Sequence, residues 1–429
     1  MVRASIRSAA VVLFVAGMAL SACSKGGSSG NNNSVFVFGE LMPYSGASAF
    51  EGAQVTNGCL PAKFLINQAG GIMGHQVTCA ETDTRGDAVD AVPAANKMVA
   101  TTSNLIAVLG PSTAEAPSTV SILSRAQLPM WSVAGDPQYD TNTDPYFYRL
   151  TPSDNLAAAA LAVEAKKHGY TNIALVFTSG GSAQSNVPPL VAAAKKLGLT
   201  IVSHFNITPG QASYSSEIAN MLAKHPQVIL NEGDPQSMAT FFSNLQQAGG
   251  LMPIIVSAYA TDAGWQKAVE AAIGNDQMAK YFEMPQPYAP AEGAGWQTYQ
   301  DALVAEKSQG TDPTAFGADI YSRTTYDACI VTALAMTETK STDRAVYNAK
   351  LADLLSAGPG KTVVTSYAEG LAALKKGESI QFVGAGGDRS LNQFHNVTGT
   401  FEIDRWDVAT KGWVLASKLT PEQLAAVNG

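Results

Sequence analysis

Short apolar runs of strand length alternate with longer segments of helical periodicity along most of the chain. The strand-like runs occupy residues 35–41, 76–83, 105–110, 129–135, 172–177, 200–207, 227–233 and 253–260. The helix-like segments include residues 88–101, 155–169, 187–198 and 238–250, and several end in Lys or His followed by Gly, as helix C-termini prefer. This alternation predicts an α/β protein with doubly wound parallel sheets and helices on both faces of each sheet.

The run at 105–110 ends in a loop with the features of a ligand site. Gly110 and Pro111 stop the run, Ser112 and Thr113 follow, and an alanine-rich helical segment comes next. A helix start presents backbone N–H groups that no helical carbonyl accepts, together with the positive end of the helix dipole. Ligands of parallel sheets bind at the carboxyl ends of strands, so we expect this loop to face a ligand.

The N-terminus has the composition of an export signal. An apolar run at 9–20 follows two arginines and, at about a dozen residues, is shorter than the roughly 20 that span a bilayer. It ends in LSAC, which resembles the lipobox of bacterial lipoproteins. The resemblance implies a signal peptide at 1–22, lipid on Cys23 and a flexible Gly/Ser/Asn-rich tether to residue 34, outside the cytoplasm. The alternative is an ordinary signal peptide followed by a chance cysteine.

Composition and charge narrow the choice of partners. The 429 residues suffice for two domains with full cores. Without residues 1–22, which hold two of the 27 basic residues and none of the 35 acidic ones, 25 basic residues face 35 acidic ones, a net charge of -10. An acidic body without a basic stripe argues against nucleic acid, and against membrane contact other than through the N-terminal lipid.

The expected export of the chain changes what can be predicted for the remaining cysteines. Cys59 shares the helical spacing of apolar neighbours that should face a sheet, and Cys79 lies in the next strand-like run. In an oxidising compartment we expect them to form a disulfide, worth roughly 3 kcal/mol; two buried thiols are the alternative. Cys329 is expected to be a buried free thiol. No Cys/His cluster has the spacing of a zinc site, so we expect no metal.

Several segments together resemble one protein family. The stretch NQAGGIMGHQV, residues 67–77, resembles the helix-to-strand turn of the type I periplasmic binding proteins, in the branch of the leucine/isoleucine/valine-binding proteins. Its glycines suit a chain reversal that needs positive φ. The same resemblance covers residues 41–58, 81–99, 108–119, 128–136, 216–249 and 399–407. It therefore extends over nearly all of the mature chain.

The resemblance implies two α/β lobes, joined by three crossings, with a ligand in the cleft between them. The lobes would comprise residues 35–150 with 286–378, and 151–285 with 379–418, followed by a tail at 419–429. Pro61 lies inside the first expected helix, so we expect that helix to kink or to start late, near Asn57.

The resemblance also implies ligand-binding residues on the first lobe. In amino-acid-binding relatives the loop at Ser112 and Thr113 holds the ligand carboxylate; the alternative is that Ser112 only caps its helix. A second loop would contribute Ser132, the carbonyl of Ala134, Gly135 and Asp136, where relatives usually have threonine.

The second half of the expected site departs from the family pattern. Tyr259 falls where relatives have the acid for the ligand ammonium, Ser182 where they have a cleft aromatic, and Asp234 where they have a tyrosine. Glu51 follows Phe50 where an apolar residue often stands. Each relocated acid could instead be a solvated rim residue. Two ligand classes stay open: an amine-bearing molecule, such as an amino acid or amide, and an uncharged or aromatic acid near Phe50 and Tyr259.

The function that follows is capture of a small polar nutrient by a monomeric extracytoplasmic lipoprotein, which delivers it to the membrane permease of an ABC transporter. A ligand-binding sensor without a transporter is the alternative. An enzyme is not expected: residues 356–362 resemble a phosphate loop but lack its first glycine, because Leu355 stands there, and no nucleophile–base pair is evident. We expect no cofactor.

Overall fold

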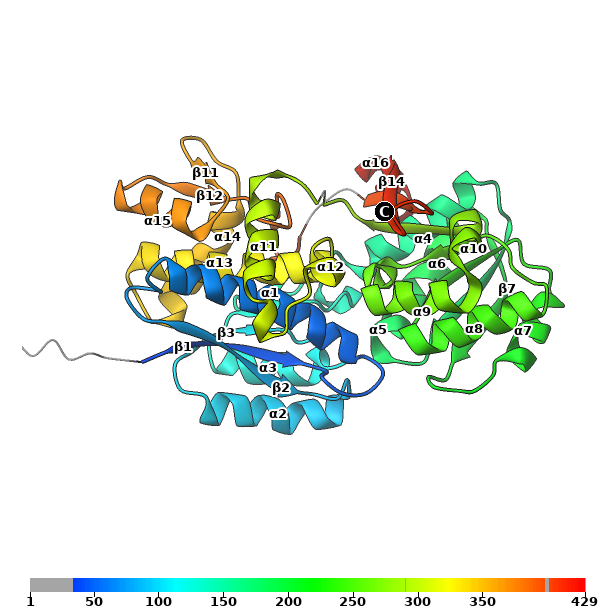
Figure 1. Ribbon diagram of the computed structural model, residues 1–429, viewed down its shortest axis with the longest axis horizontal. Coiled ribbons are helices and arrows are strands. Elements are labelled where there is room, and N and C mark those ends of the chain that lie inside the picture. The colour runs from blue at the N-terminus through cyan, green and yellow to red at the C-terminus, as the bar shows by residue number, and fades with distance from the viewer. Residues whose placement is uncertain (1–33, 290, 398–400, 429) are drawn as a thin grey trace, which may run out of the picture. The chain divides into compact units, whose positions relative to one another are not determined.

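The computed structural model describes residues 34–289, 291–397 and 401–428 (Figure 1). Two parallel sheets, each covered by helices on both faces, confirm the predicted α/β architecture of two lobes. The expected signal peptide, Cys23 and the tether before Ser34 lie outside these residues. Within them, none of the helices combines the length and the apolar character that a membrane span requires.

The first lobe is built on a five-stranded sheet with the strand order β2-β1-β3-β4-β5, all parallel. The strands are β1 (Phe36–Met42), β2 (Val77–Asp83), β3 (Leu105–Leu109), β4 (Met130–Ser132) and β5 (Phe147–Arg149). The main core lies under α1 (Ala49–Gln68), α11 (Gly293–Ala305), α13 (Ile320–Thr339), α14 (Arg344–Leu355) and α15 (Tyr367–Lys375). On the opposite face, α2 (Ala88–Thr101) and α3 (Ala116–Arg125) cover a second core.

The second lobe has a seven-stranded sheet with the order β14-β13-β10-β9-β8-β6-β7. Its parallel strands are β6 (Asn172–Thr178), β7 (Thr200–Ile207), β8 (Val228–Glu232), β9 (Ile254–Val256) and β10 (Phe282–Pro287). An antiparallel pair, β13 (Phe401–Asp407) and β14 (Gly412–Leu419), extends it. One face carries α4 (Asp154–Lys167), α5 (Gly181–Ser185), α6 (Val187–Leu197) and α16 (Pro421–Asn428); the other carries α7 (Ser215–Leu222), α8 (Pro235–Gln247), α9 (Ala263–Ile273) and α10 (Asn275–Tyr281).

The boundary expected at residue 379 must be corrected. There β12 (Ile380–Phe382) pairs with β11 (Thr362–Val364), and its apolar side chains belong to the first lobe's core. The chain stays with this lobe as far as Asn396, which bridges Arg149, and joins the second sheet at Phe401. Sequence periodicity does not show which of two cores a short apolar strand joins.

Two smaller boundaries also differ. The second passage between lobes follows Pro287, because β10 still belongs to the second sheet where residue 286 was expected to open the first lobe. The expected tail at 419–429 contains α16, whose Leu424 and Val427 are buried against α4 and α6. Apolar residues at helical spacing therefore make this end part of the second lobe's core.

Helix α1 runs through Pro61 from its start at Ala49, so the helix does not start late. Proline has no N–H and leaves the carbonyl of Asn57, four residues earlier, without its helical donor. The hydroxyl of Tyr299, from α11, lies 3.2 Å from that carbonyl and 3.0 Å from the carbonyl of Phe316, so its one proton is shared between the two. A side chain 242 positions away in sequence thus partly replaces the missing bond.

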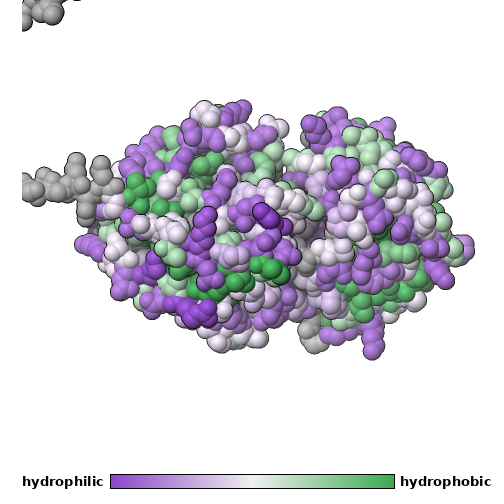
Figure 2. Space-filling view, turned by 90° about the horizontal axis from the view of Figure 1, so that it is seen from below, coloured by the Kyte–Doolittle hydropathy of each residue, from purple (hydrophilic) through white to green (hydrophobic). Residues whose placement is uncertain are grey.

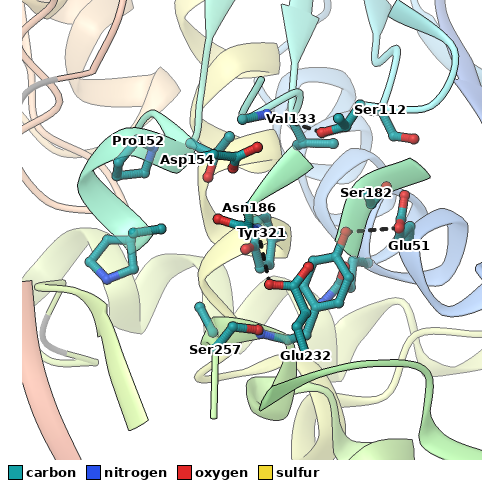
Figure 3. A pocket seen from close by; sticks show the side chains of 18 of the residues that line it. Glu51, Ser112, Val133, Pro152, Asp154, Ser182, Asn186, Glu232, Ser257 and Tyr321 are labelled. Atoms are coloured by element: carbon teal, nitrogen blue, oxygen red, sulfur yellow. Dashed lines mark hydrogen bonds between the residues drawn. The ribbon is translucent and has the colours of Figure 1, made fainter. Parts of the chain in front are cut away.

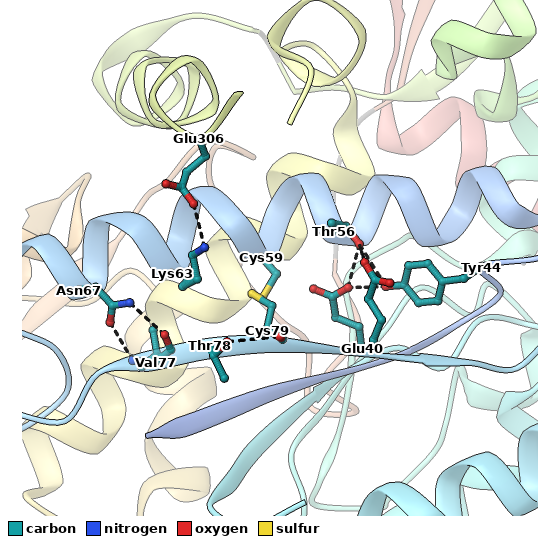
Figure 4. Close-up of a disulfide and its surroundings, with 11 residues drawn as sticks. Glu40, Tyr44, Thr56, Cys59, Lys63, Asn67, Val77, Thr78, Cys79 and Glu306 are labelled. Atoms are coloured by element: carbon teal, nitrogen blue, oxygen red, sulfur yellow. Dashed lines mark hydrogen bonds and ion pairs between the residues drawn. A yellow bond between two sulfur atoms is a disulfide. The ribbon is translucent and has the colours of Figure 1, made fainter. Parts of the chain in front are cut away.

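The predicted disulfide is confirmed. Cys59 on α1 is bonded to Cys79 on β2, with their Cα atoms 6.2 Å apart (Figure 4). The bridge joins the helix to the edge strand of the sheet beneath it. Cys329, on α13, is a buried free thiol, as predicted.

Candidate functional site

A cavity lies between the lobes, where the carboxyl ends of the two parallel sheets face each other (Figure 3). Segments after β1, β3, β4 and β5 line it from one side, and segments after β6, β8 and β9 from the other. In the space-filling view the lobes meet along a narrow waist (Figure 2). The cavity has a volume of about 60 Å³.

The carboxyl group of Glu115 accepts hydrogen bonds from the donors of the loop after β3. The backbone N–H of Ser112 donates to Glu115 Oε2 at 3.0 Å, and the Ser112 hydroxyl donates to the same oxygen. The Thr84 hydroxyl donates to Oε1 at 2.6 Å. Burial raises the pKa of the Glu115 carboxyl, and these donors offset part of the rise. A carboxyl group of the chain itself therefore sits where the sequence predicted a ligand's carboxylate.

Ser132 and Ala134 support the second loop from behind and do not line the cavity. The Ser132 hydroxyl donates to the carbonyl of Pro111 at 2.7 Å and accepts the Ala134 N–H at 3.0 Å. Gly135 does line the cavity, and its N–H donates to Thr113 Oγ1 at 3.1 Å. These bonds join the two loops to each other.

Arg149 anchors the second loop from inside the protein, where it is fully buried. Its guanidinium donates to the carbonyl of Gly135 and to Asn396 Oδ1, both at 3.0 Å. The side chain of Asp136 turns elsewhere and accepts the N–H of Gln138 at 2.9 Å, which caps the 3-10 helix η1 (Pro137–Tyr139). Asp136 therefore has a local structural role and does not line the cavity.

Asp154, at the start of α4, packs directly against Gly135. A Cβ atom on Gly135 would lie 1.8 Å from Asp154 Oδ1, so only glycine fits. Burial raises the pKa of Asp154 to about 7, although the Ser185 hydroxyl and the positive charge of Arg149 oppose the rise.

Glu232, at the end of β8, faces the cavity from the second lobe. Its Oε2 accepts from the side-chain amide of Asn186 at 3.0 Å. Burial, followed by the charges of Asp154 and Glu51, raises its pKa well above the ordinary value, while Asn186 and Ser257 offset part of the rise.

Glu51 connects the lobes across the cavity. It lies on α1, and its Oε1 accepts from the hydroxyl of Tyr259, on η2 (Ala258–Thr261) in the second lobe, at 3.1 Å. Burial, followed by the charge of Glu115, raises the pKa of Glu51 to about 7. Phe50 packs edge-on against Tyr259 with the ring centroids 5.4 Å apart, outside the cavity lining.

Comparison with known proteins decides the family. Residues 37–393 match the family described as periplasmic binding protein. The chain belongs to the periplasmic binding protein family. This identifies a binding protein rather than an enzyme, and it agrees with the resemblance found in the sequence.

Two curated relatives of this binding protein match about half of it. One is "Leu/Ile/Val-binding protein homolog 3" of Brucella melitensis, 25% identical over 232 residues, 54% of this chain and 59% of the relative. The other is "Leu/Ile/Val-binding protein BraC3" of Rhizobium johnstonii, 26% identical over 217 residues, 50% of this chain and 56% of the relative. The chain thus spans less than two thirds of each relative's length.

Solved structures share the fold over nearly the whole length. A branched-chain amino acid ABC transporter protein from Thermus thermophilus with bound valine has a TM-score of 0.73 at 14% identity, covering 92% of this chain and 99% of that one. A solute-binding protein from R. palustris in complex with benzoate has a TM-score of 0.70 at 16% identity, covering 91% and 99%. At these identities the likeness supports the fold alone.

The structure of this binding protein divides the eleven ligand-binding residues expected from its sequence into two groups. The residues that line the cavity are Glu51, Ser112, Thr113, Gly135, Ser182 and Tyr259. Those that do not are Phe50, Ser132, Ala134, Asp136 and Asp234. Asp234 caps α8 by accepting the N–H of Ser237 at 2.9 Å. Contact with a ligand stays a prediction for the first group.

Sequence reasoning missed several polar residues of the cavity: Gln54, Asp154, Asn186, Glu232, Ser257 and Tyr321. For Glu232 a signal existed, because an acid ends an apolar strand-like run just before Gly233. Asp154 could be read only as the acidic first turn of a helix. Tyr321, in a helix of the first lobe, carries no local signal.

Two groups of described residues have ligand atoms close enough for a metal ion, and neither lies in the cavity. One consists of Glu40 with Cys59 and Cys79, whose sulfurs are bonded to each other. The other consists of Glu164, His168 and Glu283, and Glu283 already pairs with Arg405 at 2.6 Å. Both arrangements are explained by bonds between residues of this protein.

Proposed function

We propose that this chain is the extracytoplasmic solute-binding protein of an ABC transporter, which captures a small polar nutrient and delivers it to a membrane permease. The observation that carries the proposal is the cavity between two lobes, which polar and apolar residues of both lobes line. The family match and the fold shared with ligand-bound transporter proteins support it. Attachment through lipid on Cys23 belongs to the same proposal and would keep the protein beside its permease.

The mechanism we propose is capture by lobe closure. The Tyr259 hydroxyl of the second lobe donates to Glu51 of the first at 3.1 Å. The Thr261 hydroxyl of the second lobe donates to the carbonyl of Ala258 at 2.8 Å and lies 3.3 Å from Asp319 of the first. A ligand that contacts both lobes shifts the population toward the closed form, because only that form makes both sets of contacts. A micromolar dissociation constant needs roughly -8 kcal/mol, which a few charge-assisted bonds and apolar walls can supply.

A thermal-shift screen of the purified protein tests the binding step. Amino acids, amides, ureas, aromatic acids and short amines are each added in excess, and the midpoint of unfolding is measured. We expect one class to raise it, since a hundredfold excess over the dissociation constant adds about 2.7 kcal/mol. Uptake of the stabilising solute by cells with and without the gene then tests delivery.

Two results would count against the proposal. If no class stabilises the protein, the cavity is not a solute site. If a solute binds but its uptake does not change when the gene is deleted, the protein acts as a sensor and not in transport.

A further inference from the structure

Four hydrogen-bond acceptors around the cavity have no partner. They are Glu51 Oε2, Asp154 Oδ2, Glu232 Oε1 and Asn186 Oδ1. Their residues line the cavity, and each is more than nine-tenths buried, with exposed fractions of 5%, 7%, 3% and 7%. A buried acceptor left without a donor costs about 1–3 kcal/mol, more if it is charged. Once its carboxyl groups are deprotonated, the cavity therefore offers acceptors to a ligand's hydrogen-bond donors.

Several first-lobe donors that could hold a carboxylate are already engaged. Both the N–H and the hydroxyl of Ser112 donate to Glu115. The N–H of Ala134 donates to Ser132, and that of Gly135 donates to Thr113. Among the described residues that line the cavity, none is Lys, Arg or His. An anionic ligand would meet three carboxyl groups and no cation.

We propose that the cavity takes a small organic cation with at least two nitrogen donor groups and no carboxylate, such as a short diamine or a guanidinium compound. This rests on the proposed solute-binding function and names its ligand class. Glu51 on the first lobe and Glu232 on the second offer one free oxygen each, so a ligand with donors at two ends bridges the lobes. The small cavity volume, about 60 Å³, favours a small ligand.

Binding of such a cation displaces protons. The pKa values of Glu51 and Asp154 are raised to about 7 and that of Glu232 is raised well above its ordinary value, so these carboxyl groups hold protons near neutral pH. A positive ligand favours their charged forms and lowers these pKa values. Affinity for the cation therefore increases as pH rises from 6 to 8, and protons are released on binding.

Isothermal titration calorimetry tests the ligand class. The probes are ethylenediamine, 1,3-diaminopropane, putrescine and guanidinium chloride; the comparison solutes are leucine, benzoate and acetamide. We expect at least one cationic probe to bind at least tenfold more tightly than every comparison solute. We also expect proton release, measured in two buffers of different ionisation enthalpy, and a severalfold gain in affinity from pH 6 to pH 8.

A matched pair of variants localises the effect. Glu232→Gln keeps the side-chain shape, removes the charge and should weaken the best cationic probe at least tenfold. Glu40→Gln is the control, because Glu40 is also buried, has a pKa raised to about 7 and lies outside the cavity lining. If Glu232→Gln does not fold, Glu51→Gln serves the same purpose from the other lobe.

The outcomes separate this inference from the proposed function. Tighter binding of leucine or benzoate overturns the cationic ligand and leaves a solute-binding protein. Acetamide binding as tightly as the cations overturns the requirement for charge. Equal losses in Glu232→Gln and Glu40→Gln overturn the role of the cavity carboxylates. Absence of binding by every solute overturns the proposed function as well.

Discussion

The loop after β3 in the first lobe and the end of β8 in the second each bury a glutamate, and the two glutamates are bonded differently. Glu115, in the loop, accepts from Ser112 twice and from Thr84 once, so both of its oxygens are used. Glu232, at the end of β8, accepts from Asn186 on one oxygen, and its other oxygen has no partner. A buried carboxyl group whose oxygens all accept hydrogen bonds within the protein stabilises the fold. A carboxyl oxygen that accepts none and lies beside a cavity is available to a ligand.

The two glutamates also differ in the charges around them. Burial raises the pKa of both. At Glu232 the charges of Asp154 and Glu51 raise it further and hydrogen bonds from Ser257 and Asn186 lower it, whereas at Glu115 the other contributions are all hydrogen bonds that lower it. The carboxyl groups on the second lobe's side of the cavity therefore disfavour one another's charged forms, an effect that a bound cation would oppose.

The largest expected effect comes from Glu115→Ala. The change leaves the N–H and hydroxyl of Ser112 and the hydroxyl of Thr84 without their acceptor inside the protein. We expect the free energy of unfolding to fall by about 3–5 kcal/mol, measured by urea denaturation at pH 7. The contrast is Glu232→Gln, which keeps the side-chain shape, replaces a buried carboxyl group whose pKa is raised well above its ordinary value, and should leave the ligand-free protein at least as stable. Equal destabilisation by both variants would contradict the comparison.

A smaller change in the free energy of unfolding, in this case an increase, is expected from Glu51→Gln. The folded-state pKa of Glu51 is about 7, against an ordinary value of 4.5, so the folded protein holds this proton more tightly than the unfolded chain. That contribution to stability is complete below pH 4.5 and is lost as pH rises through 7. Glutamine does not ionise, so we expect the variant to be more stable than the wild type by about 1–3 kcal/mol at pH 8.

Thermal denaturation at pH 4 and pH 8 measures this difference. At pH 4 the two proteins should unfold at similar temperatures, because Glu51 is neutral in both states. A variant that is less stable than the wild type at pH 8 would show that Glu51 is satisfied in the folded protein, like Glu115.

Local sequence patterns predicted most of the fold because strands and helices of this kind are defined by short-range periodicity. The helix expected at 88–101 is α2, and the strand expected at 200–207 is β7, with the same bounds. The Cys59–Cys79 bond also followed from local position, since a sheet-facing helix residue precedes the next strand. These features depend on neighbours that are close in the sequence.

Features that depend on distant partners could not be predicted. Pro61 suggested a broken helix because the hydroxyl of Tyr299, which partly replaces the missing donor, lies on another helix. Ser112 suggested a carboxylate site because nothing in the sequence shows that the side chain of Glu115 folds back onto it. Asp154, at the start of α4, and Glu232, at the end of β8, line one cavity although 78 positions separate them in the sequence. The sequence shows which residues can donate hydrogen bonds, but it does not show which acceptors those donors already bind in the folded protein.

The smallest expected effect comes from Ser112→Ala. This variant distinguishes a role of Ser112 in stabilising the loop from a role in binding the ligand. The hydroxyl donates to Glu115, so its removal should lower the free energy of unfolding by about 1 kcal/mol. Because that donor is already engaged within the protein, affinity for the solute found by screening should change less than twofold, by calorimetry. Thr84→Val is the control, since it removes the other hydroxyl from Glu115 at a residue outside the cavity lining. A severalfold loss of affinity in Ser112→Ala alone would mean that Ser112 turns from Glu115 to the ligand, as the family resemblance implies.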